Sequence, residues 1–235
     1  MTVNDIMAEL QARGDEKIKA ILLKHGVKEP FFGVKIEYLK PIQKKIKKDY
    51  QLAKDLYATG NADAQYLAGL IADDKKMTKA DLQLWAEQAL STNIAEYTVP
   101  WVAAESDFGY EMGLKWIDDN KPHIAAAGWN TLSNTVSLKT DDELPIDDLR
   151  RLMDITIKTI HSASNRVKYT MNGFIIALGC YVTALTDEAK AASAQIGPLT
   201  IDMNGTACKV PNIADNILKL ENRGSLGKKK KTVKC

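Results

Sequence analysis

The sequence predicts an all-α protein in which antiparallel helix pairs follow one another. Apolar residues recur every three or four positions along most of the 235 residues, as they do on one face of an α-helix. Short breaks with capping residues separate these segments, for example at Thr78, which is followed three residues later by Asp81. The alternation that marks a strand is confined to one short candidate, residues 199–203.

The N-terminal segments are read as helices at residues 3–13 and 15–25, each followed by a glycine suited to end it. An aromatic loop at residues 30–33 then leads into an apolar stripe over residues 36–46. Pro41 lies inside that stripe, so we expect a kink or a helix start near it. The back of the stripe carries a row of lysines that are candidates for contact with phosphate groups: Lys40, Lys44, Lys45, Lys47 and Lys48.

From residue 61 onward the helical pattern is regular. Helices are expected at about residues 61–73, 78–90, 93–105, 109–119, 122–137, 146–161, 165–182 and 186–196. Helix pairs that recur every ~30–45 residues are typical of an α-α superhelix of the HEAT type. A Gly- and Pro-rich connection at residues 197–212 and a short helix at 213–222 follow. We therefore expect a single solenoid domain over residues 1–222, with a short irregular C-terminal segment, and a flexible basic tail at 223–235.

Composition and charge narrow the possible functions. Three widely spaced cysteines, odd in number and without paired spacing, indicate a reducing compartment and neither a disulfide framework nor a zinc site. No apolar run approaches the roughly 18 residues of a membrane span. Residues 1–54 carry twelve Lys and Arg against seven Asp and Glu, and residues 61–160 carry nine against seventeen. We expect a cytoplasmic monomer without metal or cofactor, part of whose surface contacts a polyanion.

The segment 165–182, NRVKYTMNGFIIALGCYV, is the strongest candidate for a binding surface. On a helical wheel one side is apolar, and the opposite side carries Lys168, Tyr169 and Asn172 with Arg166 at its edge. Cations, a phenol and an amide on one face suit an anionic partner with flat rings, such as nucleic acid. The alternative is that Tyr169 and Asn172 are interior polar groups with partners inside a helix stack.

These motifs together resemble the DNA alkylation repair proteins of the AlkD type, which are HEAT-like superhelices. The resemblance rests on PFFGVKIEYLKPIQKKI, on the helices around residues 93–137 and on the helix 165–182, and it covers roughly residues 3–222. The chain resembles a divergent branch of that family. The implied partner is double-stranded, alkylated DNA, and the implied activity is that of an alkylpurine DNA glycosylase.

Active members of this family carry a Trp and an Asp four residues apart on one helix. The resemblance places the pair at Trp101 and Glu105, with Glu in place of Asp. A carboxylate stabilises the cationic sugar that forms when a base leaves. Counting back from Trp129, a predicted DNA-binding residue, gives another alignment, in which the pair falls at residues 95–99 and contains no Asp. Glu96 is a second carboxylate candidate on the same helix.

Active members also bind a backbone phosphate through an Arg on the next repeat. Asn130 and Thr131 occupy its place here. The catalytic set is therefore altered, and three functions stay open. The chain is a glycosylase for 3-methyladenine or 7-methylguanine, a DNA-binding protein without catalysis, or a helical-repeat scaffold that binds proteins.

Overall fold

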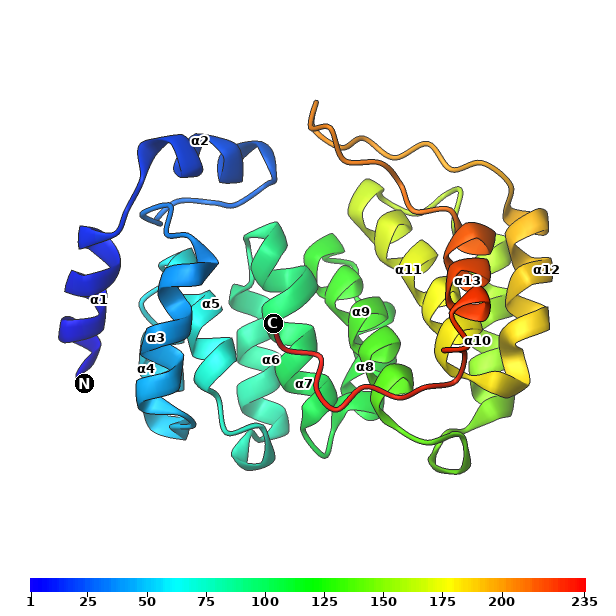
Figure 1. Ribbon diagram of the computed structural model, residues 1–235, viewed down its shortest axis with the longest axis horizontal. Helices are drawn as coiled ribbons and strands as arrows, with labels where there is room; N and C mark the ends of the chain where they lie inside the picture. The colour runs from blue at the N-terminus through cyan, green and yellow to red at the C-terminus, as the bar shows by residue number, and fades with distance from the viewer.

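Thirteen α-helices follow one another over residues 1–235 in a computed structural model, and no residue forms a β-strand (Figure 1). The structure describes the whole chain. The helices are α1 (Val3–Ala12), α2 (Glu16–Lys24), α3 (Ile36–Ile46), α4 (Tyr50–Tyr57), α5 (Ala62–Ile71), α6 (Lys79–Gln88), α7 (Val99–Glu105), α8 (Gly109–Ile117), α9 (Pro122–Leu138), α10 (Ile146–Thr159), α11 (Asn165–Tyr181), α12 (Thr186–Ile196) and α13 (Ile213–Asn222). The all-α prediction is confirmed.

From α3 onward the helices form two layers. Helices α3, α5, α7, α9 and α11 contact one another in series, and α4, α6, α8, α10 and α12 pack against them from behind. The layers run along the long axis of the molecule in chain order (Figure 1). We call the exposed side of the first layer, which faces the viewer in Figure 1, the front face. Each repeat is thus a helix pair that buries its apolar sides against its neighbours.

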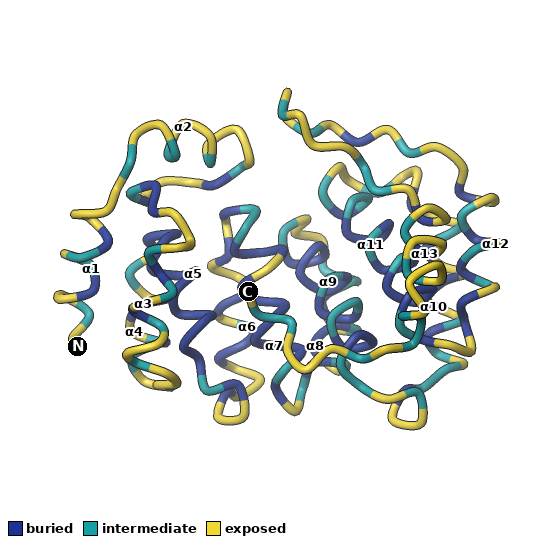
Figure 2. The backbone as a smooth tube through the Cα atoms, in the orientation of Figure 1, coloured by how far each residue is buried: buried dark blue, intermediate teal, exposed yellow.

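The apolar core has two parts that meet at α9. The first part lies between α1 and α9 and includes Trp101 and Trp116, both buried. The second lies between α9 and α13 and includes Trp129 and Phe174. Figure 2 shows buried backbone concentrated in the middle of the helix stack, while the helix ends and connections are exposed. Because α9 contributes to both parts, it links the two halves of the stack.

Local sequence signals explain several helix starts. Thr78 and Asp81 form the predicted capping box, in which the Thr78 hydroxyl accepts from the Asp81 N–H at 3.1 Å and Asp81 accepts from the Thr78 N–H at 3.0 Å. Asp49 caps α4 by accepting from the Leu52 N–H at 3.0 Å. Both caps provide acceptors for N–H groups that have no partner within their own helix.

Three expectations are wrong. Helix α4 was not predicted, because eight residues are too few to show a helical period. The candidate strand at residues 199–203 forms no strand. Helix α3 begins at Ile36 and continues through Pro41, so the alternative of a helix start near this proline is wrong. A proline removes only one backbone hydrogen bond, and the burial of Leu39 and Ile42 stabilises the helix on either side of it.

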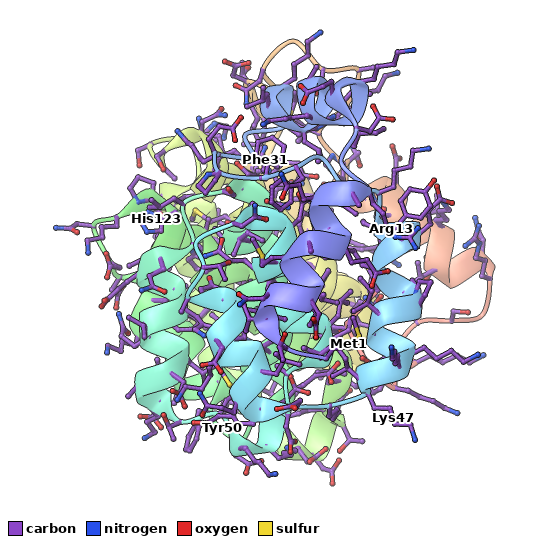
Figure 3. The ribbon with its side chains drawn as sticks, turned by 90° about the vertical axis from the view of Figure 1, so that its left-hand side faces the viewer. Met1, Arg13, Phe31, Lys47, Tyr50 and His123 are labelled. Carbon is purple, nitrogen blue, oxygen red and sulfur yellow. The ribbon has the colours of Figure 1, made fainter.

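The two connections near the C-terminus lie outside the helix layers. Residues 197–212 run from α12 to α13 past the N-terminal end of α11, and residues 223–235, which we call the tail, cross the front face from α13 to the middle of the stack (Figure 1). In the side view, Lys47 at the end of α3 points away on the same side as the tail, and His123 lies on the opposite side (Figure 3). The division into a domain and a flexible tail stays a prediction.

Candidate functional site

Arg166, a predicted DNA contact at the start of α11, is engaged by a carboxylate within the protein. Its Nε and Nη2 atoms donate to the two carboxylate oxygens of Glu96 at 2.6 and 2.5 Å. Glu96 is only 2% exposed. It projects from a π-helical turn, Ile94–Thr98, that precedes α7. Burial raises the pKa of Glu96, and the Arg166 guanidinium opposes this change. The two charges compensate each other in the interior.

Asn130, which stands where the resemblance expects a phosphate-binding Arg, is also committed inside the protein. Its side-chain amide donates to the backbone oxygen of Glu96 at 2.7 Å. The Thr131 hydroxyl donates to the Ala127 oxygen at 2.7 Å and is buried. Thus α9 presents no cation at this position, and its Asn130 side chain binds the turn that holds Glu96.

The polar face of α11 is covered in part by residues 197–212. The Asn172 side chain, 2% exposed, donates to the Pro211 oxygen at 2.9 Å. At the start of the helix, Asn165 exchanges two hydrogen bonds with the backbone of Asp202, each at 2.7 Å. Burial of Asn172 corrects its prediction as a DNA contact: it is a satisfied interior amide, the alternative that the helical wheel left open.

Tyr169 and Lys168 remain accessible on α11. Tyr169 is half-buried, and the Arg166 guanidinium stacks over its ring at 4.4 Å from the centroid. A cavity of about 230 Å³ is lined in part by Arg166, Tyr169, Tyr97 and Cys208. Lys168 is half-buried and has no ion-pair partner. The start of α11 therefore offers an aromatic ring and one free cation to a ligand.

Trp129 lies in the second part of the core. It is 3% exposed, and its ring packs against Phe174 with centroids 5.2 Å apart. A base has no access to either face of this indole. The structure therefore corrects the prediction that Trp129 contacts DNA, because its apolar area is used to join α9 to α11.

Trp101 and Glu105 lie four residues apart on α7, as the first alignment expects, but in different surroundings. Trp101 is 5% exposed and meets Tyr66 edge-on with centroids 5.3 Å apart. Together with Tyr97 these rings line an apolar cavity of about 290 Å³. The Glu105 carboxylate accepts hydrogen bonds from the tail, from the Thr232 hydroxyl at 2.5 Å and the Val233 N–H at 2.9 Å.

The lysine row at the end of α3 borders the largest hollow on the front face. This hollow has a volume of about 800 Å³. Its cationic lining comprises Lys40, Lys44, Lys47, Lys48 and Lys234. Four of the five lysines predicted to contact phosphate, Lys40, Lys44, Lys47 and Lys48, are thus brought together, and Lys45 is not among the lining residues. Lys48 is partly neutralised by Asp74, 3.2 Å away.

One contributor to this surface was missed as a candidate. Lys234 reaches the same hollow from the far end of the chain and pairs with Asp74 at 2.6 Å. No local pattern connects Lys234 with α3, because the tail reaches the hollow through contacts distant in sequence.

Other kinds of site find little support in the geometry. No three His, Cys, Asp or Glu side chains lie close enough together to hold a metal ion. No single helix has both the length and the hydropathy to cross a membrane; α11 passes that test only when joined to residues 183–196, across a bend of 113°. The surface that remains is the front face, with its lysines, its aromatic cavity and the tail.

Comparisons with known proteins agree with this picture. The family model for DNA alkylation repair enzymes matches residues 6–195. Uncharacterized proteins of Listeria innocua and Listeria monocytogenes are each 28% identical over 228 residues, which is 95% of this chain and 99% of theirs. A solved structure matches with a TM-score of 0.91 and 32% identity over the whole of both chains. It is described as a member of a new family related to the HEAT-like repeat DNA glycosylases, with affinity for branched DNA structures. This chain belongs to the DNA alkylation repair enzyme family and has the fold of its HEAT-like repeat members.

Proposed function

We propose that the protein is a DNA-binding member of its family that recognises branched DNA through the front face, without excising bases. The observation that carries this proposal is that both candidate carboxylates already bind other groups of the protein. Glu96 is bound by Arg166, and Glu105 by the tail. At the 800 Å³ hollow, in contrast, Lys44 and Lys47 are exposed and form no ion pair. The acting species in this proposal is a cytoplasmic monomer.

The chemistry of base excision explains why the committed carboxylates matter. A base alkylated on its ring is a good leaving group, so the enzyme mainly has to stabilise the positive charge that develops on the sugar. Glu96 is buried and already neutralised by a cation at 2.5 Å. Such a carboxylate contributes little to a second cation outside the protein. The absence of an Arg at Asn130 removes the corresponding phosphate contact as well.

Affinity for branched DNA is supported by the solved relative, which has 32% identity and that affinity in its description. A branched structure presents phosphates from two arms, and the front face presents cations at separate places. Lysines lie at the end of α3, and Lys168 lies on α11 at the other end of the layer. Cations spread along one face suit several backbones better than they suit a single short segment of duplex.

The test is a comparison of a four-way junction with a linear duplex of the same length and sequence composition. We expect at least several-fold tighter binding to the junction by fluorescence anisotropy, with an affinity that falls as salt is raised from about 50 to 200 mM. Equal affinity for both DNAs, measured at the same salt concentration, contradicts recognition of branching. Affinity that does not change with salt contradicts a phosphate interface altogether.

Excision of alkylated purines is the second candidate function. One observation favours it: the aromatic cavity of Tyr66, Tyr97 and Trp101 lies on the same face as Glu105, four residues beyond Trp101. This candidate predicts release of 3-methyladenine or 7-methylguanine from methylated duplex DNA, and loss of that release in Glu105→Gln. Release by the wild type that does not exceed the spontaneous rate excludes it and leaves the binding function standing.

A further inference from the structure

The tail crosses the front face and contacts several helices along its course. It leaves α13 through Gly224 and Gly227, both with positive φ, and then runs past α11, α9 and α7 (Figure 1). The Gly227 N–H donates to the Cys180 oxygen at 2.9 Å, and the Lys230 N–H donates to the Ser137 oxygen at 2.8 Å. Its last residue reaches α3, where the Lys40 ammonium donates to the terminal oxygen of Cys235. The tail therefore spans most of the front layer.

The inward side chains of the tail bind acidic groups of the front face. Lys229 pairs with Asp141 at 2.9 Å and donates to the Tyr181 oxygen at 2.5 Å. Lys234, whose side chain is 9% exposed, pairs with Asp74 at 2.6 Å. Between them lies Glu105, which accepts the hydrogen bonds of Thr232 and Val233 already described. Three carboxylates along the face thus each meet a donor of the tail.

The outward side chains of the tail are different. Lys228, Lys230 and Lys231 are exposed and form no ion pair. The Lys230 ammonium lies 5.2 Å from the centre of the Tyr181 ring, which limits where this side chain can point. In extended chain, neighbouring side chains turn to opposite sides, so Lys229 faces the protein while Lys228 and Lys230 face solvent.

The tail, with some lysines facing the protein and others facing solvent, changes the charge of the front face. Without the tail, Asp74, Glu105 and Asp141 would present carboxylates to any DNA on this surface, and like charges repel a phosphate backbone. With the tail in place these groups are covered and three cations stand above them. The C-terminal carboxylate, the one negative group that the tail adds, is bound by Lys40. The acidic middle of the chain thereby becomes compatible with a polyanion.

We propose that the tail is a built part of the DNA interface, in which Lys229 and Lys234 dock it on the front face and Lys228, Lys230 and Lys231 contact the phosphate backbone. This inference rests on the proposed DNA binding and names the residues that perform it in the middle of the face. The three outward lysines extend the cations at the end of α3 toward the C-terminal end of α11. A DNA arm laid along the layer then meets cations over its full length.

The first experiment removes the outward charges. The variant Lys228→Ala/Lys230→Ala/Lys231→Ala is compared with Lys115→Ala/Lys121→Ala/Lys158→Ala, which removes the same charge from exposed, unpaired lysines outside the front face. Binding to the DNA that the wild type prefers is measured over a range of salt. The tail variant should lower the slope of log K against log salt by about 2–3, since each phosphate contact contributes roughly 0.9. The control should change it by less than about 1.

The outcomes separate this inference from the function on which it rests. An equal loss of DNA affinity in the two triple variants contradicts phosphate contact by the outward lysines of the tail and leaves the proposed DNA binding intact. Tighter binding by the tail variant also overturns it, because the tail would then be an obstruction of the front face. Failure of the wild type to bind any DNA overturns the proposed function, and with it the proposed role of the tail in DNA binding.

A second experiment tests docking without DNA. Trypsin cleaves after lysine, and docking on Asp74 and Asp141 should protect Lys229 and its neighbours. The variant Asp74→Asn/Asp141→Asn keeps every tail lysine but loses two anchoring charges. We therefore expect at least several-fold faster cleavage within residues 228–234. The cleavage rate is measured by mass spectrometry of the intact chain. Asp118→Asn/Asp187→Asn, at exposed positions away from the tail contacts, is the control. Equal cleavage rates in the wild type and both variants contradict docking.

Discussion

Arg166 and Glu96, 70 positions apart in the chain, form a two-bond ion pair that joins α11 to the π-helical turn before α7. Removing one partner leaves the other charge uncompensated in the interior. Arg166→Met should therefore lower the free energy of unfolding by about 3–5 kcal/mol in urea denaturation. The double variant Arg166→Met/Glu96→Gln should recover much of this loss, since it removes both charges. If the double variant is as unstable as the single one, the pair has no coupled role.

A close approach of two helices gives the second prediction. A Cβ atom on Gly128 of α9 would lie 2.6 Å from the backbone nitrogen of Ile117 and 2.9 Å from the backbone of Trp116. Because backbone cannot move aside as a side chain can, Gly128→Ala should destabilise the protein by about 1–3 kcal/mol. The matched control is Gly173→Ala on α11, where the nearest atom is 3.9 Å away.

The control substitution has a predicted sign of its own. Alanine is the better helix former by up to about 1 kcal/mol, so Gly173→Ala should be neutral or stabilising. Thermal denaturation of the two variants, compared with the wild type, measures both effects. Similar destabilisation by both substitutions would mean that helix packing at α8 and α9 is not the cause.

Much of this fold follows from the sequence, because a helical period and its caps are local. The predicted helix at residues 165–182 corresponds to Asn165–Tyr181, and the predicted capping box at Thr78 and Asp81 is present. Helix α4 has only two turns and no such period. The position of the tail was also out of reach of a local pattern, since the groups that it contacts are distributed from α3 to α11.

The candidate site was predictable only in its residue types. The wheel of α11 correctly separates a polar face from an apolar one, but a helical wheel contains no information about what covers a face. Asn172 is covered by Pro211, and Arg166 by Glu96. The lysines at the end of α3 were easier to predict as a cationic surface, because they lie close together in the sequence and need no partner from another repeat. Charge on a single helix is therefore readable from sequence, whereas pairing between repeats is not.

The third prediction concerns acid stability and Asp81. This carboxylate receives the Tyr50 hydroxyl at 2.8 Å and pairs with Lys54 at 2.7 Å, in addition to its capping bonds with Thr78. Burial alone would raise its pKa, but the Lys54 and Thr78 contacts outweigh burial and lower the pKa to about 2. A pKa below that of the unfolded chain means that ionised Asp81 stabilises the fold above about pH 4, and that this contribution is lost as the pH falls toward 2.

The measurement compares the wild type with Asp81→Asn across pH. At pH 6 the variant should be less stable by about 1–2 kcal/mol, a figure that allows for solvent screening of the Lys54 pair. The difference should shrink toward zero near pH 2, because a protonated carboxyl resembles an amide. A stability difference that is constant from pH 6 to pH 2 contradicts the assignment of ionised Asp81 as the stabilising species.

The last prediction compares Lys44 with Lys45, two neighbours on α3 whose side chains lie on different parts of the surface. Lys44 lines the 800 Å³ hollow and Lys45 does not, although both are exposed and free of ion pairs. If DNA lies over the hollow, Lys44→Ala should weaken binding a few-fold and lower the salt slope by about 0.9, one phosphate contact.

Lys45→Ala is the matched control, since it removes the same charge from the same helix one position away. A general effect of net charge would lower the affinity equally in both variants, because the long-range field depends little on which lysine is removed. Only a contact distinguishes them. Equal salt slopes for Lys44→Ala and Lys45→Ala, both lower than that of the wild type, would place the phosphates elsewhere than over the hollow and reduce the role of α3 to attraction at a distance.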